Sequence, residues 1–223
     1  MKNVKFLPWV GNSYDCGVLG FDGNGVIRYG SAQMRGRRIM VLGESHYCAN
    51  PETEAVVSLT IDIISDLINP SSEHEPYKNT YTKFAKSAIG TFEELSDNAK
   101  SEFWNHVLFY NYVQTAISGA RVAPTNEEFK DSKDAFFEVL AKYKPDLVIV
   151  WGSRLYNNLP QTGNQLADLV IQQGEYAGRA VEMWSYEVES KFVALMPIVH
   201  PSAGFDLKLH NAFIRQFIEQ MEK

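Results

Sequence analysis

Three polar side chains of different chemistry stand in or just after apolar runs of the sequence, and together they suit a hydrolytic reaction. Glu44 follows soon after the run at 38–42, Asn111 lies in the run at 107–113, and His200 follows the run at 192–199. A carboxylate can orient a water molecule, and a carboxamide can read a hydrogen-bonding edge through two bonds. A histidine can donate to a leaving group that gains negative charge. These residue types suit the hydrolytic displacement of a heterocycle.

Two common reaction classes lack their motifs. No serine stands in a Gly-x-Ser-x-Gly turn, so acyl transfer through a nucleophile elbow is not expected. The chain also has no Gly-x-x-x-x-Gly-Lys loop, so a nucleotide triphosphatase is not expected either.

The elements that must position these side chains alternate along the chain. Apolar runs rich in β-branched and aromatic residues predict strands at 38–42, 107–113, 146–152 and 192–199, with a weaker candidate at 181–188. Helical patterns are expected over 51–68, 81–89, 92–106, 125–143, 153–159 and 207–221. Asn50 is the expected cap of the first helix, with Pro51 at its first position, and Thr125 with Glu128 has the spacing of a capping box.

This alternation predicts an α/β fold, namely a three-layer α/β/α arrangement around a central four-stranded, mostly parallel sheet. Ligands bind at the carboxyl ends of the strands in such sheets. The polar residues there are Glu44 to Tyr47, then Asn111, then Gly152 to Arg154, then His200 to Ser202.

The composition is that of an ordinary globular chain of 223 residues, with 45% hydrophobic and 22% charged residues. We expect a single domain over 1–223, in which residues 1–37 form an N-terminal arm or lid. The aromatic segment 6–14 either covers the site, where Asn12 or Tyr14 would touch substrate, or covers an apolar helix face.

The two cysteines rule out a disulfide scaffold within one chain. With neither a signal peptide nor a membrane-spanning run in the sequence, a monomeric, cytoplasmic protein without membrane contact is expected. A net charge of −6 argues against indiscriminate nucleic-acid coating. A local cluster of Arg28, Arg35, Arg37 and Arg38 either faces phosphates or forms a solvated loop.

Four segments, in order, resemble the uracil-DNA glycosylase superfamily over about residues 38–205. Residues 43–47, Gly-Glu-Ser-His-Tyr, are similar to its first motif, which reads Gly-Gln-Asp-Pro-Tyr-His in one branch and Gly-Glu-Ala-Pro-Gly in another. Residues 108–111 resemble the strand that ends in a base-reading asparagine, and 146–153 resemble the strand ending Leu-Leu-Trp-Gly-Ser. Residues 200–202 match the second motif, His-Pro-Ser.

The resemblance implies a monofunctional DNA glycosylase with no cofactor and no metal, whose partner is single- or double-stranded DNA. Glu44 would serve the attacking water and His200 would stabilise the departing base anion. Asn111 would recognise the Watson–Crick edge of a flipped base, beside Tyr47, His46 and Ser45. Ser202 and Ser153 would contact DNA, and Phe205 would wedge into the base stack.

The chain also departs from both branches. Ser45 stands where one branch has aspartate, and His46 where both have proline. The iron–sulfur cysteines of the Gly-Glu-Ala-Pro-Gly branch are absent. The base is therefore left open: uracil, a damaged base, or a modified base such as a cytosine of phage DNA, in repair or in antiviral defence. The alternatives are a non-catalytic nucleic-acid or nucleotide-binding module that retains the pocket, and an enzyme acting on free nucleosides.

Overall fold

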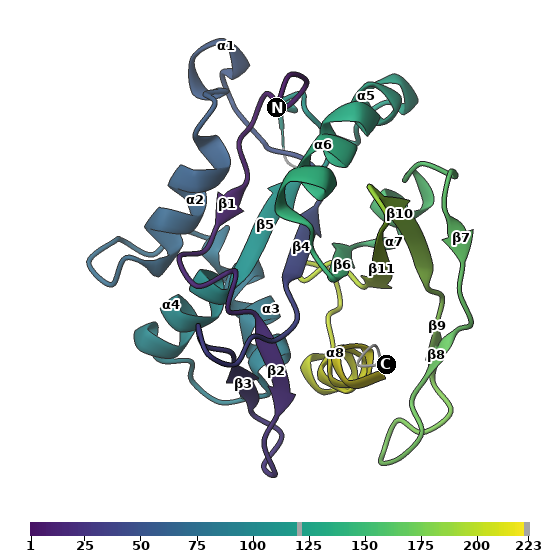
Figure 1. The fold of residues 1–223 in the computed structure, drawn as a ribbon. Coiled ribbons are helices and arrows are strands. Elements are labelled where there is room, and N and C mark those ends of the chain that lie inside the picture. Colours follow the sequence, from purple (N-terminus) through teal and green to yellow (C-terminus); the bar gives the residue numbers. More distant parts are fainter. Residues whose placement is uncertain (120–121, 221–223) are drawn as a thin grey trace.

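A seven-stranded sheet runs through the molecule in the order β1-β5-β4-β6-β11-β10-β7. The structure, a computed structural model, describes residues 1–119 and 122–220 (Figure 1). The strands of this sheet, in spatial order, are β1 (Trp9–Val10), β5 (Val107–Asn111), β4 (Ile39–Gly43), β6 (Leu147–Trp151), β11 (Lys191–Ile198), β10 (Trp184–Val188) and β7 (Asn164–Gln165).

The inner four strands are the ones that the apolar runs predict. β5, β4, β6 and β11 run parallel to one another. The expected four-stranded sheet was incomplete, because β1 is added antiparallel to β5, and β10 and β7 are added antiparallel beyond β11. β1 and β7 have two residues each, too short for a periodic signal in the sequence.

Two small antiparallel pairs lie outside this sheet. β2 (Val18–Phe21) pairs with β3 (Ile27–Tyr29), and β8 (Leu169–Val170) pairs with β9 (Ala180–Val181). The region 1–37, expected as an arm, thus contributes both an edge strand and a hairpin.

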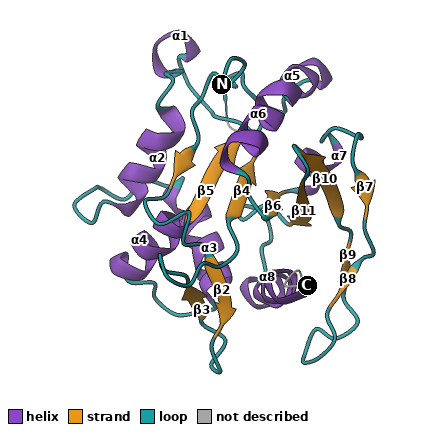
Figure 2. Cartoon of the chain, in the orientation of Figure 1, coloured by secondary structure: helices purple, strands orange, loops and turns teal. Residues whose placement is uncertain are grey.

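Helices flank both faces of the sheet (Figure 2), consistent with the expected layered arrangement. They are α1 (Pro51–Glu54), α2 (Leu59–Ile68), α3 (Lys78–Ile89), α4 (Asp97–His106), α5 (Asn126–Asp131), α6 (Lys133–Tyr143), α7 (Ser153–Asn157) and α8 (Leu207–Gln220). Alternate residues of each inner strand face opposite layers. Val41 belongs to the buried cluster that includes residues of α2, α3, α4 and α8, whereas Met40 and Leu42 belong to the cluster that includes residues of α6 and α7.

Two expected helices are divided. The helix expected over 51–68 breaks after Glu54, and Asn50 makes no side-chain cap bond. Val56 and Val57, counted there as apolar helix positions, are exposed in the connection. The segment 125–143 forms α5 and α6, which meet at Ser132, whose hydroxyl accepts from Gln114 N and donates to Glu128 O. The capping box of Thr125 and Glu128 is confirmed.

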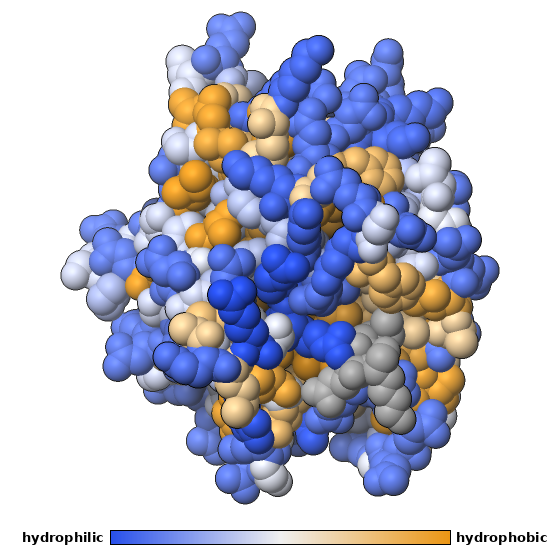
Figure 3. All heavy atoms as spheres, in the orientation of Figure 1, coloured by the Kyte–Doolittle hydropathy of each residue, from blue (hydrophilic) through white to orange (hydrophobic). Residues whose placement is uncertain are grey.

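Apolar side chains are concentrated in the two layers beside the sheet. The inner strands β4, β5 and β6 are buried along their whole length. On the face drawn in Figure 3, hydrophilic residues predominate and the apolar ones lie scattered among them.

Candidate functional site

The carboxyl ends of the four parallel strands lie level at one rim of the sheet. Gly43 at the end of β4 is opposite Asn111 at the end of β5, and Trp151 of β6 is opposite Ile198 of β11. In Figure 1 the arrowheads of β4 and β5 point towards the N-terminus of the chain. Glu44 follows β4 directly and His200 follows β11 after one residue, so the topology brings the three leading candidates to this rim.

Glu44 is buried and held by Arg154 of α7. Arg154 Nε donates to Glu44 Oε2 at 2.8 Å, and Nη2 donates to Oε1 in a second, short bond. The Arg154 side chain is 53% exposed while that of Glu44 is 9% exposed, so the pair lies at the surface with its anion turned inward. Accepting these bonds, Glu44 raises the pKa of the Arg154 guanidinium. The two bonds therefore fix the direction of the carboxylate.

The partnership of Arg154 with Glu44 is a feature that sequence reasoning missed. The only indication of this pair in the sequence is that Arg154 stands two residues after Gly152, at the end of β6. Gly152 has a positive φ of 94°, a region that favours glycine, and it turns the chain into α7. This turn brings Arg154 towards Glu44.

The loop that follows His200 binds one of its two ring nitrogens, Nδ1. The backbone N–H of Ser202 donates to His200 Nδ1 at 3.2 Å, and Ser202 Oγ lies 2.8 Å from the same atom. Since a backbone N–H can only donate, Nδ1 carries no proton, and the proton of the neutral ring is on Nε2. Burial lowers the pKa of His200, and Arg154 lowers it further, against an opposing effect of Glu44. A neutral imidazole with an Nε2–H donor is therefore the form expected at neutral pH.

The side chain of Asn111 lies against a buried histidine. Asn111 Nδ2 is 3.2 Å from both ring nitrogens of His46, and His46 Nε2 is 2.9 Å from Thr60 Oγ1 of α2. His46 is 2% exposed, and its ring meets that of Phe6 edge-on at a centroid distance of 5.0 Å. Burial lowers its pKa to about 4, so this histidine is neutral. The expected base-binding residue His46 thus lies behind Asn111.

Gly43 leaves the space that the Asn111 amide occupies. A Cβ atom at Gly43 would lie 2.2 Å from Asn111 Oδ1, well inside contact distance. The position of Asn111 therefore requires glycine at residue 43, and Asn111 Oδ1 lies directly over the end of β4.

An aromatic group adjoins the rim on the same face as Asn111. Tyr81 of α3 contacts Trp151 and Phe109 edge-on at centroid distances of 5.4 and 5.3 Å, and Trp151 meets His200 at 5.8 Å. Burial, and then the proximity of Tyr47, raises the pKa of Tyr81. Tyr47 itself is 51% exposed, and it contributes to raising the pKa of Arg154. Tyr81 is a second residue at this rim that the sequence did not indicate.

The remaining predicted site residues differ in their surroundings. Ser45 Oγ is buried and has no hydrogen-bond partner within residues 1–119 and 122–220. Ser153 is exposed at the first position of α7, and Ser202 is exposed and bound to His200. Phe205, the expected wedge, is half-buried and stacked on His210 of α8 at 4.2 Å. A wedge role would require this stack to open.

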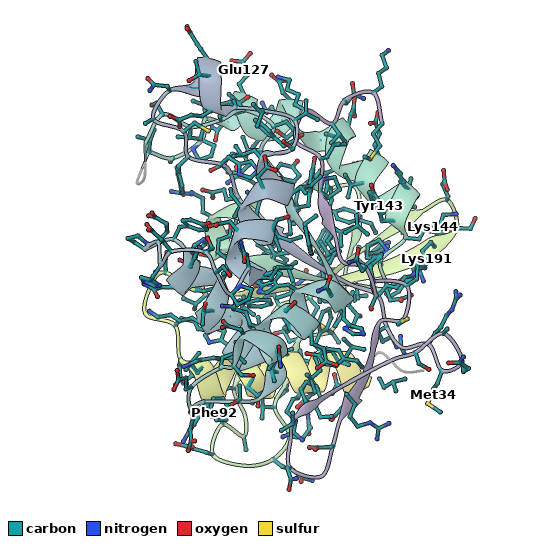
Figure 4. The ribbon with its side chains drawn as sticks, turned by 90° about the vertical axis from the view of Figure 1, so that its left-hand side faces the viewer. Met34, Phe92, Glu127, Tyr143, Lys144 and Lys191 are labelled. Carbon is teal, nitrogen blue, oxygen red and sulfur yellow. The ribbon has the colours of Figure 1, made fainter. Side chains whose placement is uncertain are left out.

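The arginine segment before β4 is placed away from the rim. Arg38 precedes β4, and its backbone N–H donates to Asp146 Oδ2 at 2.7 Å at the amino end of β6. Lys191 at the start of β11 also bonds Asp146. In Figure 4, Lys191 lies near Tyr143 and Lys144 at this end of the molecule. Arg38 is therefore part of an ion-pair group at the opposite end of the parallel strands.

A cavity of about 420 Å³ lies among α7, β7, β10 and their connections, and it is lined by Tyr156, Asn157, Leu159, Gln161, Gln165, Glu182, Trp184 and Tyr186. This lining shares no residue with the candidate site.

Residues 1–119 and 122–220 contain neither a cluster of metal-ligating side chains nor a helix suited to span a membrane. Across that part of the chain, no three His, Cys, Asp or Glu side chains are grouped as a metal site would require. None of the helices there combines the length and the apolar character needed to cross a membrane.

Comparison with known proteins gives no match, either to a protein-family model or to a curated protein. The chemical interpretation of the site consequently depends on the residues and contacts described above.

Proposed function

We propose that this protein is a divergent uracil-DNA glycosylase-type enzyme that hydrolyses the N-glycosidic bond of a flipped base and leaves an abasic site. The observation that carries the proposal is the meeting of Glu44, Asn111 and His200 at one rim, with the Nε2–H of a neutral His200 free of the bonds that hold Nδ1. The three side chains supply a water-directing anion, a base-reading amide and a donor for the leaving group.

In the reaction, Glu44 orients a water molecule towards the anomeric carbon as the bond to the base lengthens. The sugar gains oxocarbenium character, and its positive charge is stabilised by the nearby carboxylate. The base departs with the bonding electron pair, and the Nε2–H of His200 donates a hydrogen bond to this anion. The water oxygen bonds to the anomeric carbon, and Glu44 accepts the proton that the water loses. A carboxylate has about four lone-pair sites, so the two bonds from Arg154 leave others for water.

Arg154 has a second role in this proposal. Its half-exposed guanidinium is available to a DNA phosphate at the mouth of the site. It pairs with Glu44 and also places positive charge beside the sugar–phosphate backbone, in a chain whose net charge is −6.

A second candidate function is a non-catalytic module that binds a nucleotide at the same rim. The observation in its favour is that both oxygens of Glu44 are engaged by Arg154, as in a structural ion pair. Such a module would bind DNA through Asn111 and the aromatic group without breaking a bond.

Base release from labelled DNA separates the two. Strands carrying uracil, hypoxanthine, hydroxymethylated cytosine or glucosylated cytosine are incubated with the protein and then cleaved with alkali at abasic sites. We expect cleavage of one of these strands, lost by at least a hundredfold in Glu44→Gln. Glu52→Gln, at an exposed position of α1, is the matched control and retains activity. Binding of every strand without any abasic site would favour the non-catalytic module.

A further inference from the structure

A single buried histidine bonds to both ends of the loop that carries His200. This loop, residues 199–206, connects β11 to α8. The backbone N–H of Val199, its first residue, donates to His210 Nε2 at 3.2 Å. His210 Nδ1 lies 2.6 Å from the backbone oxygen of Asp206, the last residue of the loop. His210 is 4% exposed, so its ring depends on these two partners for its hydrogen bonds.

These two partners leave the His210 ring a single protonation state. A backbone N–H can only donate, so Nε2 carries no proton, and a backbone oxygen can only accept, so Nδ1 carries one. Burial lowers the pKa of His210, against the opposing effects of its hydrogen bond to Asp206 and of the charge of that residue, in agreement with a neutral ring. Neither backbone group can exchange its role, so the contacts permit no second arrangement.

The two ends of the loop differ in how firmly they are held. At the far end, Phe205 stacks on the His210 ring at a centroid distance of 4.2 Å and an interplanar angle of 20°. Asp206 Oδ1 also accepts from two backbone N–H groups in the first turn of α8, both at 3.0 Å, and so caps this helix. At the near end, the N–H of Val199, next to His200, is bonded to the ring of His210.

The position of Val199 bears directly on that of His200. The two residues share a peptide group, so a displacement of Val199 also moves the His200 ring. In the proposed reaction the Nε2–H of His200 must meet the departing base, and a misplacement of about 1 Å can cost a hundredfold in rate. A bond that fixes Val199 therefore affects the chemical step more than the binding of DNA.

We propose that His210 is a positioning residue for His200: its ring joins the two ends of the 199–206 loop, and its bond to Val199 sets where the Nε2–H of His200 meets the leaving base. The inference deepens the proposed function and rests on it for the role of His200, whereas the joining of the loop ends stands on the contacts alone. His210 acts through the loop and does not touch the base.

Three substitutions separate the bond to Val199 from the stack on Phe205. The amide of His210→Gln reaches about as far as Nε2 and can accept from Val199, whereas that of His210→Asn reaches about as far as Nδ1 and can serve only Asp206. His210→Phe keeps a ring for the stack and loses both bonds. If the Val199 bond is what matters, His210→Gln retains the natural behaviour; if packing matters, His210→Phe does.

His106→Phe is the matched control. His106 is also a buried helix residue, its Nδ1 lies 2.8 Å from the backbone oxygen of Glu102 four positions earlier, and its ring stacks on Tyr29 at 4.3 Å. It directly precedes β5, at the opposite end of this strand from Asn111. The variant thus loses the same kind of bond from a stacked histidine, at a site remote from the 199–206 loop.

The first readout does not depend on enzymatic activity. In ¹⁵N-labelled protein at about pH 7.5, the ring signals of His210 should show a proton on Nδ1 and none on Nε2. The Val199 amide should exchange slowly with solvent in the natural protein, His210→Gln and His106→Phe, and at least tenfold faster in His210→Asn and His210→Phe. A proton on Nε2, or equal exchange of Val199 in the natural protein and His210→Phe, would overturn the joining of the loop ends.

The second readout is kcat and KM for base release from the strand that the natural protein cleaves. We expect kcat to fall about tenfold in His210→Asn and His210→Phe, the equivalent of one net hydrogen bond. KM should stay within about twofold, because Asn111 and Arg154 are unchanged, and His210→Gln and His106→Phe should retain the natural kcat.

A kcat that is unchanged in His210→Phe, or higher there than in His210→Gln, would contradict the positioning role. If the natural protein released no base, the proposed function would fail and the positioning role with it. The exchange of the Val199 amide would then still show whether His210 joins the ends of the loop.

Discussion

The guanidinium of Arg154 donates two hydrogen bonds to the carboxylate of Glu44, from Nε to Oε2 at 2.8 Å and from Nη2 to Oε1. The two residues come from the ends of neighbouring parallel strands, β4 and β6. The carboxylate that follows β4 is thus paired with a guanidinium that follows the neighbouring strand, β6. Because Glu44 is buried and Arg154 is half-exposed, removal of the arginine leaves a buried carboxylate without its partner. It should therefore cost more stability than removal of the glutamate.

The pair can be separated by a double-mutant cycle. Arg154→Met leaves a buried carboxylate without its partner, and we expect a loss of about 1–2 kcal/mol in the free energy of unfolding, less than a fully buried pair because of solvent screening. Glu44→Gln leaves only an exposed cation and costs less. Urea unfolding of both single variants and the double variant gives the coupling. Additive effects would mean that the ion pair contributes nothing to stability.

The same two charges should move the pKa of His200 in opposite directions. Arg154 lowers this pKa and Glu44 raises it, in addition to the dominant lowering by burial. We therefore expect Arg154→Met to raise the His200 pKa and Glu44→Gln to lower it. Titration of the His200 ring signals by NMR measures both shifts. Shifts of the same sign in the two variants would contradict this arrangement of charges.

The stability of the protein should decrease in weak acid because of His46. Its folded pKa is about 4, against about 6.5 in an unfolded chain. Between these pH values the unfolded chain binds a proton that the folded protein does not, so the free energy of unfolding falls as pH falls. His46 therefore costs no stability above pH 6.5, whereas at pH 4 its titration has lowered the free energy of unfolding by roughly 3 kcal/mol.

His46→Phe isolates this effect, because other groups titrate alike in both proteins. In urea unfolding between pH 7.5 and pH 4.5, the variant should show a shallower dependence on pH than the natural protein. Parallel curves would mean that His46 titrates normally in the folded state.

Gly43 should tolerate no side chain. In Gly43→Ala the new methyl group would lie 2.2 Å from Asn111 Oδ1 and 3.0 Å from Phe109 Cζ. We expect a loss of about 1–3 kcal/mol in stability, as for other overpacked positions, together with loss of base release through displacement of Asn111. Gly23→Ala is the control, since nothing lies within 4 Å of a Cβ there. Normal base release by Gly43→Ala would show that Asn111 is not needed in this position.

Much of the scaffold could be predicted from the sequence. Continuous apolar runs identified β4, β5, β6 and β11, because strands buried on both faces have no polar alternation to obscure them. The parallel order then placed Glu44, Asn111 and His200 at one rim. The break between α1 and α2 could not be predicted, since Val56 and Val57 fit the helical pattern but are exposed.

The partners within the site were harder to predict than its leading residues. Arg154 bonds Glu44 across 110 positions of sequence, and no spacing rule connects them. Thr60 is an ordinary helix residue until α2 packs against His46. Tyr81 lies in an amphipathic helix, α3, whose aromatic residues would be expected to be core residues from the sequence pattern alone. These contacts follow from how helices lie on the sheet, which local patterns do not specify.

The short strand β1 has a further consequence. Trp9 and Val10 pair with Phe109 and Leu108 and so cover the outer side of β5. Without them, the open N–H and C=O groups of β5 would be available to a strand of another molecule, a common start of aggregation. Phe6, just before β1, packs on His46, and Gln114 accepts from the backbone N–H of Phe6 at 3.1 Å. A truncation or a bulky tag that displaced this segment would therefore promote self-association and expose the buried contact of His46 with Asn111 to water in a single step.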